Sequence, residues 1–225
     1  MQFHQSSSQS GNILFIILIA VALFAALSFA VGQSMRSGGG TGAAQETSRI
    51  NSAYLHQFPT SIRQAILRME VSKSLTSEDI SFAHPGTTDY GTFGTTPEQE
   101  VFHPLGGATP YQLPPANLND GSEWIFNGDL EVKDLGKTNG DSGSTELMAL
   151  LPGVKLEVCK YLNYGVSNSL QTPPSLTLTG ETNKFTGAFG YTSTITDAVL
   201  DGKDAYCYYS TALGKYVYYQ VLEQR

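Results

Sequence analysis

The pattern of hydrophobic and polar positions begins with one long apolar stretch near the N-terminus. Residues 13–31 read ILFIILIAVALFAALSFAV, nineteen residues with no charge and a single hydroxyl, on Ser28. At a helical rise of about 1.5 Å per residue this stretch is about 29 Å long, close to the roughly 30 Å hydrocarbon thickness of a bilayer. Because no polar face interrupts it, the pattern predicts a membrane-spanning helix over residues 12–31 rather than a buried core helix.

A flexible connection is predicted directly after this span. Residues 32–44 are rich in glycine and include Gly38, Gly39 and Gly40 in a row. Since each glycine destabilises a helix by about 1 kcal/mol relative to alanine, we expect the helix to break here and residues 32–44 to act as a hinge.

Helical periodicity then resumes between residues 45 and 73. Apolar side chains recur every three or four positions and predict one stripe facing a core. Pro59 lies inside this pattern and is expected to kink or split the helix. The stripe consists of Ile50, Tyr54, Phe58, Ile62, Ile66 and Met69.

The pattern changes between residues 78 and 132, where loops dominate. Short strands are expected at residues 80–84, 100–104, 124–126 and 130–132, with a turn at Gly128 and Asp129. Trp124, the only tryptophan, is expected to anchor the core. The polar stretch at residues 134–144 is interpreted as a solvated turn, and a calcium site built from Asp134, Asn139 and Asp141 is the less favoured alternative.

The C-terminal part alternates between helical and strand patterns. Residues 145–163 predict two short helices divided at Pro152 and Gly153. The later segments SLTLTG, KFTGAFG, AYCYYS and KYVYYQVL are rich in threonine and aromatic residues, and they predict strands with a hairpin turn at residues 212–214. Residues 45–225 are therefore predicted to form one α+β domain, with the amphipathic helix packed on a C-terminal antiparallel β-sheet.

Two cysteines bear on the compartment. Cys159 and Cys207 would close a loop of about 49 residues, a disulfide that the chain-entropy model values at about 4 kcal/mol. A disulfide places the domain in an oxidising compartment, outside the cytoplasm. Two separate buried thiols are the alternative, and Arg36 and Arg49, the nearest basic residues to the span, favour the opposite orientation.

Composition limits the function classes. The net charge is −7 with no basic cluster, which argues against nucleic-acid binding. The four histidines are scattered, no CxxC pair occurs, and GxSxG and HExxH motifs are absent from the sequence. We therefore expect no catalytic residues, no metal ligands and no cofactor, and we expect that the protein is not an enzyme.

The leader MQFHQSSSQSG followed by the apolar helix resembles the class III signal of type IV pilins and pseudopilins. The resemblance implies cleavage by a prepilin peptidase between Gly11 and Asn12, with residues 1–11 as the leader peptide. The fifth mature position, where family members usually carry glutamate, is Ile16, which is more typical of a minor pilin or pseudopilin. The segments VFHPLGG, QLPP, GSEWIFNG, LMALLPGVKLEVC and YYQVL are also similar to a group of bacterial pilin-like proteins to which no activity is assigned.

This resemblance implies a pilin-like subunit in the bacterial inner membrane, with its head in the periplasm or in an extracellular filament. Other pilin-like subunits are then expected partners, and Ala22, Ala25 and Ala26 would permit close packing of their helices. Two alternatives stay open: a single-span periplasmic protein that binds a partner or ligand without polymerising, and a secreted β-rich protein cleaved after Ala30.

Overall fold

The computed structural model describes the chain over residues 10–168 and 170–225, and the side chains over residues 14–33, 46–168 and 170–225. The protein is an α+β protein with an N-terminal apolar helix, two further helices and a mixed sheet. The chain divides into two compact units, residues 1–47 and residues 48–225, and each is described by itself. The second unit is called the head here.

The long helix α1 (Ser10–Lys73) contributes to both units. Its backbone is helical throughout residues 32–44, so the predicted break in the helix is wrong. Glycine lowers helix propensity but can still adopt helical dihedral angles. Because helix flanks this segment on both sides, no new nucleation is needed and the helix only has to extend through it. The role of residues 32–44 as a hinge stays a prediction.

The helix also continues across Pro59, so of the kink or split expected there the split does not occur. Proline removes one backbone donor, and neighbouring hydroxyls hydrogen-bond to carbonyls around it. Thr60 Oγ1 donates to the His56 carbonyl at 2.7 Å, and Ser61 Oγ donates to the Phe58 carbonyl at 2.7 Å.

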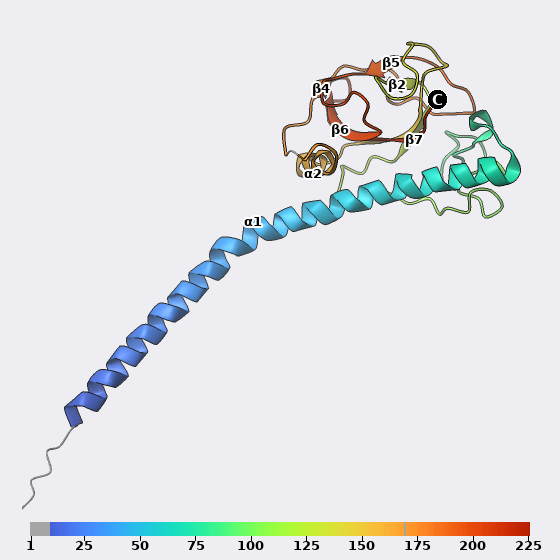
Figure 1. The fold of residues 1–225 in the computed structure, drawn as a ribbon. Helices are drawn as coiled ribbons and strands as arrows, with labels where there is room; N and C mark the ends of the chain where they lie inside the picture. Colours follow the sequence, from blue (N-terminus) through green and yellow to red (C-terminus); the bar gives the residue numbers. More distant parts are fainter. Residues whose placement is uncertain (1–9, 169) are drawn as a thin grey trace, which may run out of the picture. The chain divides into compact units, whose positions relative to one another are not determined.

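A five-stranded mixed sheet forms the centre of the head, in the order β1-β3-β7-β6-β4. Figure 1 labels three of its strands, β4, β6 and β7. All neighbours are antiparallel except β4 and β6, which are parallel, so the expectation of a purely antiparallel sheet is corrected. A separate two-stranded parallel sheet pairs β2 with β5. The strands are β1 (Ile125–Asn127), β2 (Leu130–Val132), β3 (Leu147–Pro152), β4 (Ser175–Leu176), β5 (Ser193–Ile195), β6 (Ala205–Ser210) and β7 (Lys215–Glu223).

Alternate residues of the central strands contribute to two hydrophobic clusters. Along β3, Leu147, Ala149 and Leu151 join the cluster that contains the α1 stripe, whereas Met148 and Leu150 join the other. This strand is buried along its whole length, and its continuous apolar run explains why a short helix was predicted there. Only the second predicted helix exists, as α2 (Leu156–Ser167), which packs against β6 and β7.

The predicted apolar stripe is buried from Phe58 onward. Phe58 is 3% exposed, and Ile62, Ile66 and Met69 are fully buried in the same cluster as the sheet residues. The first two members of the stripe, Ile50 and Tyr54, are instead 61% and 38% exposed.

The region between α1 and β1 holds almost no regular structure besides the 3-10 helix η1 (Ser77–Asp79). The strands expected at residues 80–84 and 100–104 reduce to one isolated bridge between Ser81 and Glu100. Packing of aromatic rings holds these loops instead: Phe82 stacks on Phe126 with centroids 4.1 Å apart, and Trp124 is 2% exposed, as expected of a core anchor.

A proline-rich segment, residues 104–117, follows α1 in the opposite direction. Lys73 and Arg68 donate to the carbonyls of Leu105 and Gly107 near its start. Further along, Tyr54 Oη donates to Gln112 Oε1 at 3.1 Å. These contacts join successive positions of both segments, so residues 104–117 cover one side of the head part of α1.

The C-terminal hairpin agrees with the prediction. Strands β6 and β7 pair antiparallel around the turn at residues 212–214, with Tyr206 opposite Tyr219. KFTGAFG forms no strand and instead supplies Phe185 and Phe189 to the aromatic packing, whereas β5 was not predicted.

Candidate functional site

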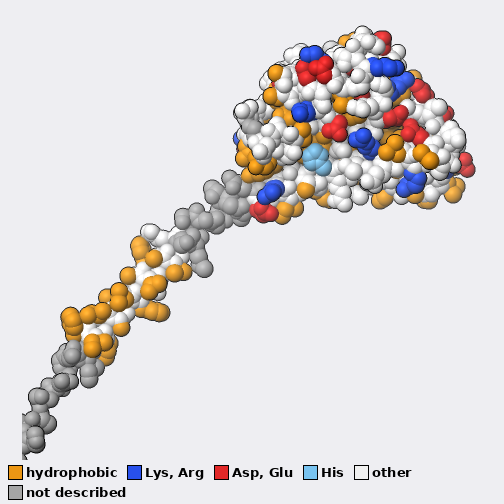
Figure 2. Space-filling view, viewed as in Figure 1, with side chains coloured by type: hydrophobic (Ala, Val, Ile, Leu, Met, Phe, Trp, Pro, Cys, Tyr) orange, Lys and Arg blue, Asp and Glu red, His pale blue; other side chains and the backbone are white. Residues whose placement is uncertain are grey.

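The N-terminal part of α1 is a candidate membrane anchor. Leu14–Gln33 is long and apolar enough to cross a membrane. Its large apolar side chains are exposed, from 45% for Ile19 to 75% for Phe24. Figure 2 shows apolar side chains gathered along this stretch of the helix. Ala22, Ala25 and Ala26, the residues predicted to allow close helix packing, are also exposed.

The predicted processing site lies outside the residues whose side chains are described. The structure places Gly11 and Asn12 in the first helical turn of α1 by backbone only. Cleavage between these two residues therefore stays a prediction.

The exposed surface of α1 within the head is almost free of charge. Between Ile50 and Ser72 the exposed positions include one charged residue, Arg68, which donates a hydrogen bond to the Gly107 carbonyl. The Arg63 side chain, at the edge of this surface, is 42% exposed and pairs with Asp204 at 3.6 Å. Leu67 and Val71 are 49% and 85% exposed. An exposed helix of a soluble monomer normally carries charged residues on its solvent side. We call this surface the uncharged helix face, because all its exposed residues but Arg68 are uncharged; they are Ile50, Ala53, Tyr54, Gln57, Thr60, Gln64, Leu67, Arg68, Val71 and Ser72.

The predicted disulfide is present. Cys159 in α2 and Cys207 in β6 are bonded, with their Cα atoms 5.4 Å apart, and both are fully buried. Asn163 reinforces this contact by donating to the Cys207 carbonyl at 2.8 Å and accepting from the Cys207 amide at 2.7 Å. The disulfide therefore holds α2 on the sheet.

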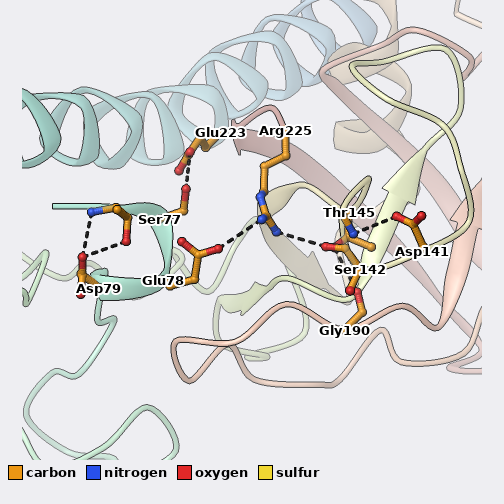
Figure 3. Close-up of polar contacts among 11 residues, drawn as sticks. Ser77, Glu78, Asp79, Asp141, Ser142, Thr145, Gly190, Glu223 and Arg225 are labelled. Atoms are coloured by element: carbon orange, nitrogen blue, oxygen red, sulfur yellow. Dashed lines mark hydrogen bonds and ion pairs between the residues drawn. The ribbon is translucent and has the colours of Figure 1, made fainter.

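Arg225 joins three segments that are distant in the sequence (Figure 3). Its guanidinium donates to Glu78 Oε1 at 3.1 Å and to the Ser142 carbonyl at 3.1 Å, and it lies 3.8 Å from the centroid of the Phe189 ring. Beside it, Ser77 donates to Glu223. These contacts hold the end of the chain against η1 and the loops around residues 142 and 189.

Two carboxyls meet where α1 approaches the end of β7. Burial, together with the charge of the nearby Glu223, raises the pKa of Glu70 to about 7. Glu70 therefore stays protonated in the folded head below about neutral pH.

A second carboxylate cluster lies beneath the polar loop at residues 134–144. Glu131 is 1% exposed and accepts from the amides of Asn139 and Gly140 at 3.1 and 2.9 Å, and also from the Ser144 hydroxyl. Glu146 is fully buried, and burial raises its pKa to about 8. The loop thus wraps a buried carboxylate with its amides, which is more order than the predicted solvated turn.

No group of three or more metal-binding side chains occurs in the described part of the chain. His84 is 3% exposed and stacks on Tyr111 with ring centroids 3.7 Å apart, and its Nδ1 lies 3.0 Å from the Phe82 carbonyl. His56 Nδ1 lies 2.7 Å from the Tyr218 hydroxyl, and burial lowers the pKa of His56. His84 thus packs in the core, whereas His56 is half-buried and hydrogen-bonds to the core residue Tyr218.

The geometry defines an α+β head, closed by one disulfide, on a chain with one candidate membrane span. Comparison with protein-family models gives no match, and comparisons with curated proteins and with solved structures give none either. The chain's class therefore rests on its own architecture.

Sequence reasoning missed the uncharged helix face and the buried carboxyls. The first had a signal in the sequence: between residues 50 and 72 the only charged residues are Arg63, Arg68 and Glu70. The second had none, because Glu131 and Glu146 flank a polar loop and look like ordinary exposed acids until the fold buries them.

Proposed function

We propose that this chain is a membrane-anchored, type IV pilin-like structural subunit, a minor pilin or a pseudopilin, that assembles through its N-terminal helix. The observation that carries the proposal is the uncharged helix face, on which Arg68 is the one charged residue among the exposed positions from Ile50 to Ser72. Exposed apolar side chains on this face, such as Leu67 and Val71, favour an interaction site. The proposed partners are other pilin-like subunits, and the role is structural rather than catalytic, with no cofactor.

The disulfide supports the proposed location. A bond between Cys159 and Cys207 persists in an oxidising compartment, which favours a head in the periplasm or in an extracellular filament, with the anchor in the inner membrane of a bacterium. In the proposal a prepilin peptidase removes residues 1–11 before assembly.

Cross-linking between copies tests the assembly. Val71→Cys places a thiol on the uncharged helix face, and Val199→Cys places one on an exposed loop elsewhere on the head, at 85% and 39% exposure of the native side chains. In membranes under mild oxidation, we expect a disulfide-linked dimer from Val71→Cys and none from Val199→Cys. Equal cross-linking of both variants, or of neither, would contradict the proposal.

N-terminal sequencing of membrane-bound protein tests the processing. We expect a mature start at Asn12, abolished by Gly11→Val and unchanged by Ser6→Ala in the leader. A start at Met1 together with no cross-linking favours the single-span binding protein, and a start at Val31 in soluble material favours the secreted alternative.

A further inference from the structure

A cavity of about 340 Å³ lies at one end of the five-stranded sheet, away from α1 and from both carboxylate clusters. Its volume lies within the range of pockets that hold small ligands. Strands β1, β3 and β7 contribute Ile125, Pro152 and Lys215 to its wall, and the hairpin turn contributes Leu213. The remaining lining residues are Ser122, Glu123, Thr182 and Lys184.

The wall formed by the sheet is apolar. Ile125 is 7% exposed, Pro152 is buried and Leu213 is partly buried against the same hydrophobic cluster. An aliphatic side chain placed on these three residues would leave water, at a gain of about 25 cal/mol per Å² of apolar area. The cavity therefore favours a ligand with one small apolar group.

The polar rim carries one available charge of each sign. Within the described residues, Glu123 has no hydrogen-bonding or ion-pairing partner. Lys184 has a long contact to Asp89, at 3.7 Å, and the Asp89 side chain is 55% exposed, so this pair is weak. The Lys184 ammonium also lies 5.3 Å from the centroid of the Tyr90 ring, and neither contact neutralises its charge in a buried ion pair. Lys215 is already occupied, because its ammonium lies 2.6 Å from Asp120, whose pKa falls to about 2 through that contact and the Ser122 hydroxyl.

We propose that this cavity binds a small zwitterion of the amino-acid class that bears an apolar side chain, either a free amino acid or a dipeptide. The ligand's ammonium pairs with Glu123, its carboxylate pairs with Lys184, and its side chain packs on Ile125, Pro152 and Leu213. A simple anion or cation satisfies one of the two charged groups and leaves the other unpaired. The site is independent of assembly, because none of its residues belongs to α1.

Calorimetric titration of the full chain in detergent tests this proposal. The probes are L-leucine and L-leucyl-L-leucine, and each is compared with its N-acetylated form and its C-terminal amide. We expect saturable binding of at least one unmodified probe, and at least about a tenfold weaker affinity when either end is blocked. The unmodified probe with the lower Kd shows whether the site prefers a free amino acid or a dipeptide.

Charge-removing variants assign the two ends. Glu123→Gln should weaken binding of the unmodified probe about tenfold and leave binding of the N-acetylated probe unchanged. Lys184→Met should also weaken binding of the unmodified probe about tenfold, and it should leave binding of the C-terminal amide unchanged. Glu157→Gln and Lys160→Met, which remove an exposed ion pair on α2, are the matched controls and should change nothing. Thermal unfolding verifies that each variant is folded.

Two results would overturn the proposal. One is the absence of saturable heat with every probe up to about 10 mM, a concentration well above a millimolar Kd. The other is an affinity for the unmodified probe that is the same in Glu123→Gln and Lys184→Met as in the two α2 control variants. Neither result bears on cross-linking through Val71, so the assembly proposal is judged separately.

Discussion

The two parts of α1 use apolar residues in opposite ways. In the stretch Leu14–Gln33 the apolar side chains point in all directions and are exposed, whereas in the head Phe58, Ile62 and Ile66 form one buried stripe against the sheet. The first pattern is the one expected of a helix that lipid covers, and the second contributes to folding of the head itself. The same helix therefore carries apolar residues in two patterns, exposed on all sides in one part and buried along one stripe in the other.

A matched pair of isoleucines gives the largest expected contrast between these two parts. Ile62 is fully buried and Ile17 is 57% exposed. Ile62→Ala should lower the free energy of unfolding by about 2–5 kcal/mol through lost burial and the cavity left behind. Ile17→Ala should change it by less than about 0.5 kcal/mol. Chemical denaturation of both variants in detergent measures the contrast, which disappears if the stripe is not part of the head's core.

The disulfide exists only in the head and can be removed there. The double variant Cys159→Ala, Cys207→Ala should lower the free energy of unfolding by about 2–4 kcal/mol, because the unfolded chain regains the freedom of a long closed loop. Denaturation of the oxidised protein and of the double variant measures this effect. Membrane association should be unchanged, and a loss of association would show that the anchor depends on the folded head.

A charge in the anchor reverses the contrast. Leu23→Arg places a cation near the middle of the candidate span and should disfavour insertion by about 2.5–3.5 kcal/mol, without unfolding the head. Leu67→Arg on the uncharged helix face is the control and should leave membrane association intact. Co-sedimentation with membranes measures the membrane-bound fraction of each variant. A bound fraction of Leu23→Arg equal to that of the wild type would contradict the assignment of the span.

Buried carboxyls distinguish the head from the anchor, which has none among residues 14–33, and they should make the head's stability depend on pH. The pKa of Glu146 rises from about 4.5 to about 8 on folding, so the folded state binds one more proton between these values. The free energy of unfolding should therefore fall as pH rises through this window, by at most about 1.4 kcal/mol per pH unit.

Glu146→Gln isolates that dependence. The glutamine oxygen can still accept from the Val132 amide, a contact of 2.8 Å in the native protein, and the titrating proton is gone. The variant should unfold with a flatter pH dependence, measured by urea denaturation from pH 5 to pH 9. Glu70→Gln should give a smaller change, because the Glu70 side chain is partly solvent-exposed. An unchanged slope in Glu146→Gln would mean that Glu146 is ionised in the folded head.

The sequence by itself determined the features that depend on local periodicity. The uninterrupted run at residues 13–31 predicted the candidate span, and the spacing of Phe58, Ile62 and Ile66 predicted the buried face of the helix. The hairpin β6–β7 followed from two strand-like runs around a turn, and the only two cysteines form the disulfide. In each case neighbouring residues in the chain carry the signal.

Tertiary structure alone decided the rest, because the competing forms had similar local patterns. The run LMALLP fits a helix or a buried strand equally well, and it became β3 because it lies between β1 and β7. The strand-like segments at residues 80–84 and 100–104 form only an isolated bridge, and aromatic contacts such as Phe82 on Phe126 order them instead. Glu131, Glu146 and the cavity beside Glu123 and Lys184 exist only because distant segments meet, and no local pattern records which segments will do so.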